Sequence, residues 1–302
     1  MQAEDLSAAG ERPLWRRIVD FPLVAMLIAL ALAFAAYTVG IIIEKHLPLP
    51  PESVEKLALA SAIQIALVFA VYKLAIARLG DPPHDDLKSS GALKNLLIGL
   101  AFGAILFAAI VGIAALLDVY NIVGPGSTRT LATDLISAAI MPGFMEELLF
   151  RGILFLWIER FAGSWAALIV TSALFGLAHI LNPNATWFSS FAIAMEAGLL
   201  LGGAYMLTRN LWMPMGLHAA WNYTQGFIFD VPVSGMDQEG LVEAKLSGPT
   251  LLSGGSFGLE ASVIALLVAT GTGIWLLTLA VKRGNVVRPW WAQSRASSTP
   301  VS

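Results

Sequence analysis

The chain has 302 residues, of which 57% are hydrophobic and 13% are charged, and its mean hydropathy is +0.74. Because a soluble domain carries about 25% charged residues, this composition excludes a soluble enzyme as the main body of the protein. A formal net charge of −3 offers no basic surface for nucleic acid. The absence of cysteine excludes disulfides, thiolate metal sites and a cysteine nucleophile.

Eight apolar runs follow along the chain, and each has about the 20 residues needed to cross a bilayer about 30 Å thick. They lie at about residues 21–43, 54–77, 93–117, 131–157, 163–181, 187–207, 211–229 and 259–281. The sequence therefore predicts one all-α domain over residues 17–287, a polytopic membrane helix bundle of about eight transmembrane helices. The run from Leu131 is the least regular, because Pro142 and Gly143 can break it into two shorter helices.

The lysines and arginines predict the orientation of the bundle, because basic residues near span ends stay on the cytoplasmic side. With the N-terminus inside, 13 of them lie at inner span ends, and four lie at outer ends: Lys45, Lys56, Arg129 and Lys245. We therefore expect both termini in the cytoplasm. The polar segments 1–16 and 288–302 lack apolar residues to pack, so we expect poorly ordered cytoplasmic tails there.

The run 131–157 carries three ionisable residues, each of which costs several kcal/mol in hydrocarbon unless it faces the bundle interior. Glu147 and Arg151 lie one helical turn apart, a spacing that allows an ion pair. Glu146 lies about 100° further round the helix. The spacing predicts one carboxylate neutralised by Arg151 and a second one that points into a cavity. A purely structural ion pair is the alternative for Glu147 and Arg151, and the two roles are compatible.

Two of the four histidines, His179 and His218, lie in apolar runs, whereas His46 and His84 lie in proline-rich loops. Asn222 follows His218 by one turn, on the same helix face. An isolated histidine in a membrane helix often makes only an interhelical hydrogen bond, which is the alternative to a functional role. Combined with the two glutamates and the arginine, however, these residues form a set typical of hydrolytic sites.

The sixth run, 187–207, has two further features. Glu196 is ionisable, but no motif surrounds it, and it stays outside the predicted catalytic set. Gly198, Gly202 and Gly203 are predicted to allow close approach of neighbouring helices.

Three short motifs stand in order on separate predicted helices. They are E-E-x-x-x-R from Glu146 to Arg151, F-x-x-x-H from Phe175 to His179, and H-x-x-x-N from His218 to Asn222. In order and spacing they resemble the motifs of the CPBP family of intramembrane proteases, which includes the type II CAAX prenyl endopeptidases and the bacterial Abi proteins. The resemblance covers about residues 130–230 and rests on three motifs rather than one. It implies an intramembrane endopeptidase, in the inner (plasma) membrane of a bacterium.

The resemblance also implies the role of each site residue. Glu146 is the general base and His179 helps it to activate a water, while Glu147 and Arg151 hold the helix face. His218 and Asn222 face the scissile carbonyl, and Asn222 suits an oxyanion donor because its amide donates hydrogen bonds without carrying charge. These residue types also suit a divalent metal, such as zinc, bound by Glu146, His179 and His218. No H-E-x-x-H helix is present, so three helices would have to supply such a metal site. We favour water activation without a metal.

The expected partners are the lipid bilayer and a substrate that is a membrane protein or a lipidated peptide, with no nucleic acid. A proton-coupled transporter is one alternative, because intramembrane Glu and His residues also form proton relays. No similarity between the two halves of the chain supports it. A non-catalytic scaffold or bacteriocin-immunity protein is the other alternative, and the intact motif positions argue against it.

Overall fold

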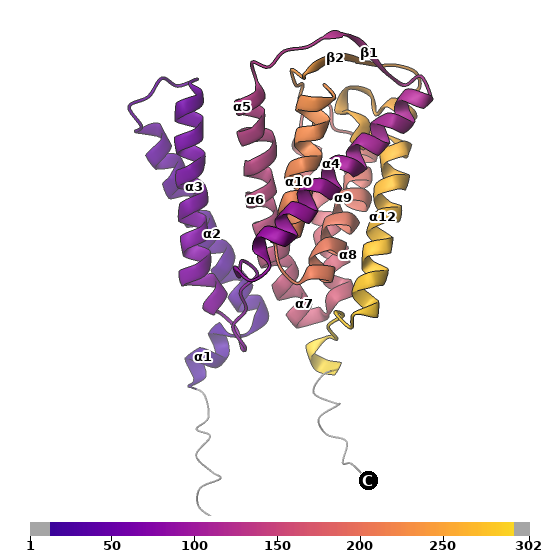
Figure 1. The fold of residues 1–302 in the computed structure, drawn as a ribbon. Helices are drawn as coiled ribbons and strands as arrows, with labels where there is room; N and C mark the ends of the chain where they lie inside the picture. The colour runs from indigo at the N-terminus through magenta and orange to yellow at the C-terminus, as the bar shows by residue number, and fades with distance from the viewer. Residues whose placement is uncertain (1–12, 293–302) are drawn as a thin grey trace, which may run out of the picture.

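The computed structural model describes residues 13–292, which form a helix bundle with a small β-sheet at one end (Figure 1). The helices pass alternately between the two ends of the bundle. The long single helices are α2 (Pro22–Lys45), α3 (Val54–Leu74), α4 (Ala92–Leu116), α8 (Ser164–Ala178), α9 (Trp187–Thr208), α10 (Trp212–Tyr223) and α12 (Val263–Lys282). The predicted fold class, an all-α polytopic membrane bundle, is confirmed.

Six helical segments of the described chain are long and apolar enough to cross a membrane. They are α2, α3 with the short helix η1 (Ile76–Arg78), α4, α8 with η4 (His179–Leu181), α9 and α12. The other two predicted spans correspond to composite helices, one over residues 131–162 and one over 212–228. The predicted number of eight is therefore approximate, although all eight apolar runs are helical.

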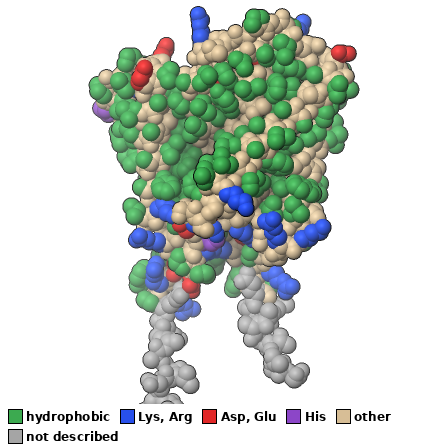
Figure 2. Space-filling view, in the orientation of Figure 1, with side chains coloured by type: hydrophobic (Ala, Val, Ile, Leu, Met, Phe, Trp, Pro, Cys, Tyr) green, Lys and Arg blue, Asp and Glu red, His purple; other side chains and the backbone are tan. Residues whose placement is uncertain are grey.

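The surface between the two ends of the bundle is apolar, as a bilayer requires (Figure 2). Leu27, Phe34 and Leu74 are each more than half exposed there. The basic residues gather at one end, which also holds α1 (Leu14–Val19) and the C-terminal end of α12. We call this the basic end, and we call the opposite end, with β1 (Tyr120–Pro125) and β2 (Val242–Leu246), the sheet end. The described residues at the basic end are Arg16, Arg17, Lys73, Arg78, Lys88, Lys94, Arg160, Arg209, Lys282, Arg283 and Arg288.

The predicted tails, 1–16 and 288–302, lie largely outside the described residues. Within the described part, residues 14–16 belong to α1. Leu14, Trp15 and Ile18 of α1 are more than half exposed. Apolar side chains exposed on a short helix beside a membrane span suit the bilayer interface, which explains the order of this segment.

The helix over residues 131–162 is continuous, and Pro142 does not break it. It consists of α5 (Leu131–Asp134), the π-helical segment η2 (Leu135–Ile140), α6 (Met141–Glu147), the π-helical segment η3 (Leu148–Phe155) and α7 (Leu156–Ala162). A proline ring clashes with the preceding turn of a regular α-helix. The wider π-helical turns of η2, which directly precede Pro142, relieve that clash, and such turns are frequent at functional sites.

Glycines on α9 allow it to pack closely between α8 and α12, as predicted. A Cβ atom at Gly198 would lie 2.5 Å from the side chain of Ser172 on α8. At Gly203 it would lie 3.1 Å from a backbone oxygen of Gly273 on α12. Any larger residue would therefore separate the helices.

The two strands at the sheet end were not predicted. β1 and β2 pair antiparallel, with Tyr120 opposite Leu246 and a bulge between Ile122 and Gly124. The alternation of apolar and polar residues in β2 is the only signal in the sequence, and it is five residues long. Because more than 100 residues separate the strands, their pairing depends on the bundle that brings them together.

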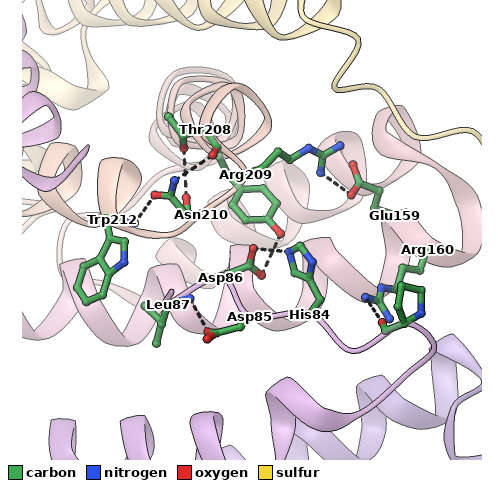
Figure 3. A network of polar contacts seen from close by, with 12 residues as sticks. His84, Asp85, Asp86, Leu87, Glu159, Arg160, Thr208, Arg209, Asn210 and Trp212 are labelled. Carbon is green, nitrogen blue, oxygen red and sulfur yellow. Dashed lines mark hydrogen bonds and ion pairs between the residues drawn. The ribbon is translucent and has the colours of Figure 1, made fainter. Parts of the chain in front are cut away.

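A polar network ties four segments together at the basic end (Figure 3). The buried carboxylate of Asp86 accepts hydrogen bonds from His84 Nε2 at 2.8 Å and from the Tyr205 hydroxyl at 3.2 Å. Glu159, in the middle of α7, accepts one from Arg209 Nη1 at 2.7 Å, and Arg209 Nη2 donates to the carbonyl of Asn285 beyond α12. The network therefore joins the loop 79–91, α7, the α9–α10 turn and the segment after α12.

Candidate active site

A cavity of about 800 Å³ lies between α2 and the composite helix 131–162. Its walls are largely apolar and include Leu30, Phe34 and Met145. The polar side chains Glu146, His179, His218 and Asn222 all line it. The structure thus brings four of the six predicted site residues to one cavity, from α6, η4 and α10.

The two adjacent glutamates face different surroundings. Glu146 lines the cavity, and its Oε2 atom is buried without a hydrogen-bond partner among the described residues. Glu147 is fully buried and does not line the cavity. Its Oε1 atom accepts from Arg151 Nη1 at 2.9 Å and from His218 Nδ1 at 2.9 Å. The predicted ion pair is present, and the carboxylate that faces the cavity is that of Glu146.

Arg151 connects the site to two further helices. Its guanidinium Nη2 donates to the carbonyl of Ala197 on α9 at 3.2 Å. Its Cζ atom lies 4.8 Å from the ring centroid of Phe175 on α8, within the range of a cation–π contact. With only 1% of its surface exposed, Arg151 fixes the position of Glu147 from several directions at once.

Phe175 lies between the two histidines. Its ring centroid is 4.7 Å from that of His179 and 6.1 Å from that of His218. The sequence places His179 near the outer end of its helix and His218 near the inner end of its own, which suggests a difference in depth. Packing against one aromatic ring brings both imidazoles to the same cavity.

The hydrogen-bond partners of the two histidines indicate that each ring carries a hydrogen on Nδ1. His179 Nδ1 lies 2.7 Å from the carbonyl oxygen of Phe175, which can only accept. His218 Nδ1 lies 2.9 Å from the Glu147 carboxylate, which also accepts. Each Nδ1 therefore donates, and each neutral ring keeps an unprotonated Nε2 for other partners.

Asn222 is held by the backbone of the composite helix. Its partner is the carbonyl of Ala138, in the π-helical segment η2. The Nδ2 atom of Asn222 donates to that Ala138 carbonyl at 2.8 Å. The same nitrogen has a second hydrogen, which remains available to a ligand in the cavity.

A second, much smaller cavity of about 30 Å³ lies behind the histidines. Glu196 lines this cavity and not the large one, and neither of its buried carboxylate oxygens has a partner among the described residues. Glu260, which no motif marked, also lines it and accepts from the Ser234 backbone N–H at 2.7 Å. Burial raises the pKa of the Glu260 carboxyl, while the Ser234 donors act in the opposite direction. Glu260 could have been identified from the sequence as an acidic residue at the start of the apolar run 259–281.

The residues do not fit the metal site considered from the sequence. Within residues 13–292, no three His, Asp or Glu side chains are grouped so that they would hold a metal ion. Glu146, His179 and His218 line one cavity without forming such a group. The geometry therefore does not support a zinc site at these residues.

Comparison with known proteins agrees with the geometry. Residues 128–224 match the family described as type II CAAX prenyl endopeptidase Rce1-like, and this segment includes all three motifs. No curated protein and no solved structure matches the chain. Residues 128–224, which supply Glu146, His179, His218 and Asn222 to one cavity, are thus similar to the Rce1-like CAAX proteases of the CPBP family.

Proposed function

We propose that this protein is an intramembrane endopeptidase that hydrolyses a peptide bond with a water activated by Glu146 and His179. The observation that carries the proposal is the buried, unpartnered Oε2 atom of Glu146 in a cavity shared with both histidines and Asn222. A carboxylate without a protein partner is available to accept a proton from water. The similarity of residues 128–224 to a CAAX protease family supports the same reaction class.

The side chains divide the reaction between them. Glu146 takes a proton from the attacking water and returns it to the amine that leaves, so the carboxylate is regenerated. His179 Nε2 accepts the second hydrogen bond of that water. The free N–H of Asn222 donates to the oxyanion, and His218 in its protonated form adds a second donor through Nε2. Glu147 and Arg151 position His218.

The substrate class follows from the walls of the cavity. Leu30, Phe34 and other apolar side chains of α2 face the polar groups, so the site suits a peptide with an apolar or lipidated segment. We propose a membrane protein or a lipidated peptide as the substrate, and the inner membrane of a bacterium as the location.

The test compares three purified proteins in detergent, using a quenched fluorescent peptide with an apolar anchor. Wild type should cleave the peptide, and Glu146→Gln should not. Glu55→Gln is the matched control, because Glu55 is an exposed glutamate in the first turn of α3. Cleavage by Glu146→Gln at the wild-type rate would contradict the assigned base. Loss of activity with a chelator, and its recovery with zinc, would contradict the metal-free reaction.

A further inference from the structure

The large cavity reaches only one end of the bundle. At the sheet end it is lined by Ser137, near the start of the composite helix, and by Ser234 and Met236 of the loop after α10. Met236 is 46% exposed, so this loop forms the mouth of the cavity. On α3, the cavity extends as far as Val68. This residue lies roughly 21 Å along the helix from its start at Val54, which is at the sheet end. No residue of the loops at the basic end lines the cavity.

The basic end is closed beneath the site. Buried Phe155, Trp157 and Tyr205 fill the bundle there. Below them lies the network of Asp86, His84 and their neighbours (Figure 3). A separate cavity of about 620 Å³ at this end shares no lining residue with the large one. Water and substrate therefore reach Glu146 through the mouth at the sheet end or from the bilayer.

The two ends of the bundle carry different numbers of basic and acidic residues, and this difference indicates the orientation of the bundle in the membrane. Eleven of the described lysines and arginines lie at the basic end and four lie at the sheet end (Figure 2). Basic residues in short loops beside membrane spans are retained in the cytoplasm. The acidic residues show the opposite preference, with ten described at the sheet end and five at the basic end.

We infer that the active site opens on the extracytoplasmic side of the membrane, and that its substrate is the extracytoplasmic part of a membrane-anchored polypeptide. The substrate half of this inference rests on the proposed function, whereas the orientation does not. A protein prenylated at its C-terminus in the cytoplasm presents its scissile bond on the other side of the bilayer. Such a protein is therefore not the substrate of this enzyme, although the family is named after that reaction.

The absence of cysteine makes the orientation directly measurable. Single cysteines are introduced at the mouth, as Met236→Cys, and in the exposed loop at the basic end, as Ser90→Cys. Asp237→Cys, beside Met236 and also exposed, provides a second position in case one variant folds poorly. A membrane-impermeant maleimide is added to intact cells and, separately, to inverted membrane vesicles.

We expect labelling of Met236→Cys and Asp237→Cys in intact cells to exceed that of Ser90→Cys at least tenfold, with the reverse ratio in inverted vesicles. The opposite pattern, or equal labelling from both sides, would overturn the inference. The experiment is repeated in the Glu146→Gln background, because labelling requires no peptide hydrolysis. If the orientation is as inferred but the purified wild type cleaves no peptide, only the proposed function fails.

Discussion

Two buried polar clusters lie in this bundle, and they differ in how completely their hydrogen bonds are satisfied. The cluster at the candidate active site consists of Glu146, Glu147, Arg151 and His218, and three of its buried atoms have no partner in the described chain: Glu146 Oε2, Glu147 Oε2 and Arg151 Nε. The network at the basic end, centred on Asp86 and Glu159, contains no such atom among the described residues.

We interpret this difference as one between groups available for chemistry, as proposed above, and groups that hold the fold. Both carboxylate oxygens of Asp86 accept a hydrogen bond, and its backbone N–H donates to the Tyr72 hydroxyl oxygen at 3.0 Å. A buried polar group without a partner costs free energy, so it persists where a ligand completes it. If this interpretation is right, substitutions in the first cluster change activity, whereas those in the second change stability alone.

The largest effect is expected for Glu146→Gln. Loss of a general base lowers the rate by about 10²- to 10⁴-fold. The unfolding temperature should stay near that of wild type, because the side chain makes no hydrogen bond through the buried Oε2 atom. Peptide cleavage and thermal unfolding in detergent are measured on the same preparation. A large drop in the unfolding temperature would show that Glu146 helps to hold the fold, as the residues at the basic end do.

Arg151→Ala should affect both properties. It removes one partner of a fully buried pair, and breaking such a pair costs about 3–5 kcal/mol of unfolding free energy. Activity should fall as well, because Glu147 then holds His218 less firmly. Arg78→Ala, at an exposed arginine, is the control and should change stability by no more than about 0.5 kcal/mol. A stable Arg151→Ala protein would show that His218 alone can satisfy Glu147.

Tyr205→Phe tests the second cluster. It removes the hydroxyl that donates to Asp86 at 3.2 Å, and we expect a loss of about 1–2 kcal/mol in unfolding free energy. Cleavage of the peptide should stay at the wild-type rate at a temperature where both proteins are folded. A selective loss of activity would break the comparison, because it would tie the basic end to the chemistry.

The smallest effect is expected for Trp212→Phe. Trp212 Nε1 donates to the carbonyl of Lys88 at 2.9 Å in a half-buried position at the basic end. Water can replace this donor, so the change in unfolding free energy should not exceed about 0.5 kcal/mol. Thermal unfolding is the measurement, and a shift as large as that of Tyr205→Phe would show that the whole network is equally critical.

Much of the fold could be predicted from the sequence, because long apolar runs have few alternatives in a bilayer. All eight runs are helical, and the ion pair between Glu147 and Arg151 follows from their spacing. The pairing of β1 with β2 could not be predicted, since it depends on segments brought together by the bundle.

The site was predictable in its residue types and only partly in its contacts. Spacing alone does not show which glutamate meets His218, because the two elements are 71 residues apart. The contact between Asn222 and the Ala138 carbonyl could not be predicted either, because the two residues are 84 positions apart in the chain. Glu260 was missed because its neighbours at the small cavity come from distant segments.

The π-helical segments η2 and η3, on either side of α6, determine where this helix can gain or lose a residue. A π-helical turn contains one residue more than the α-helical turn it replaces. Deleting one residue within η2 would convert it to a regular turn and leave the face of α6 unchanged. Deleting one within α6, before Glu146, would rotate the following residues by about 100°, so that Glu147 would take the direction of Glu146 and Glu146 that of Met145. Length variation among related chains should therefore concentrate in these two segments.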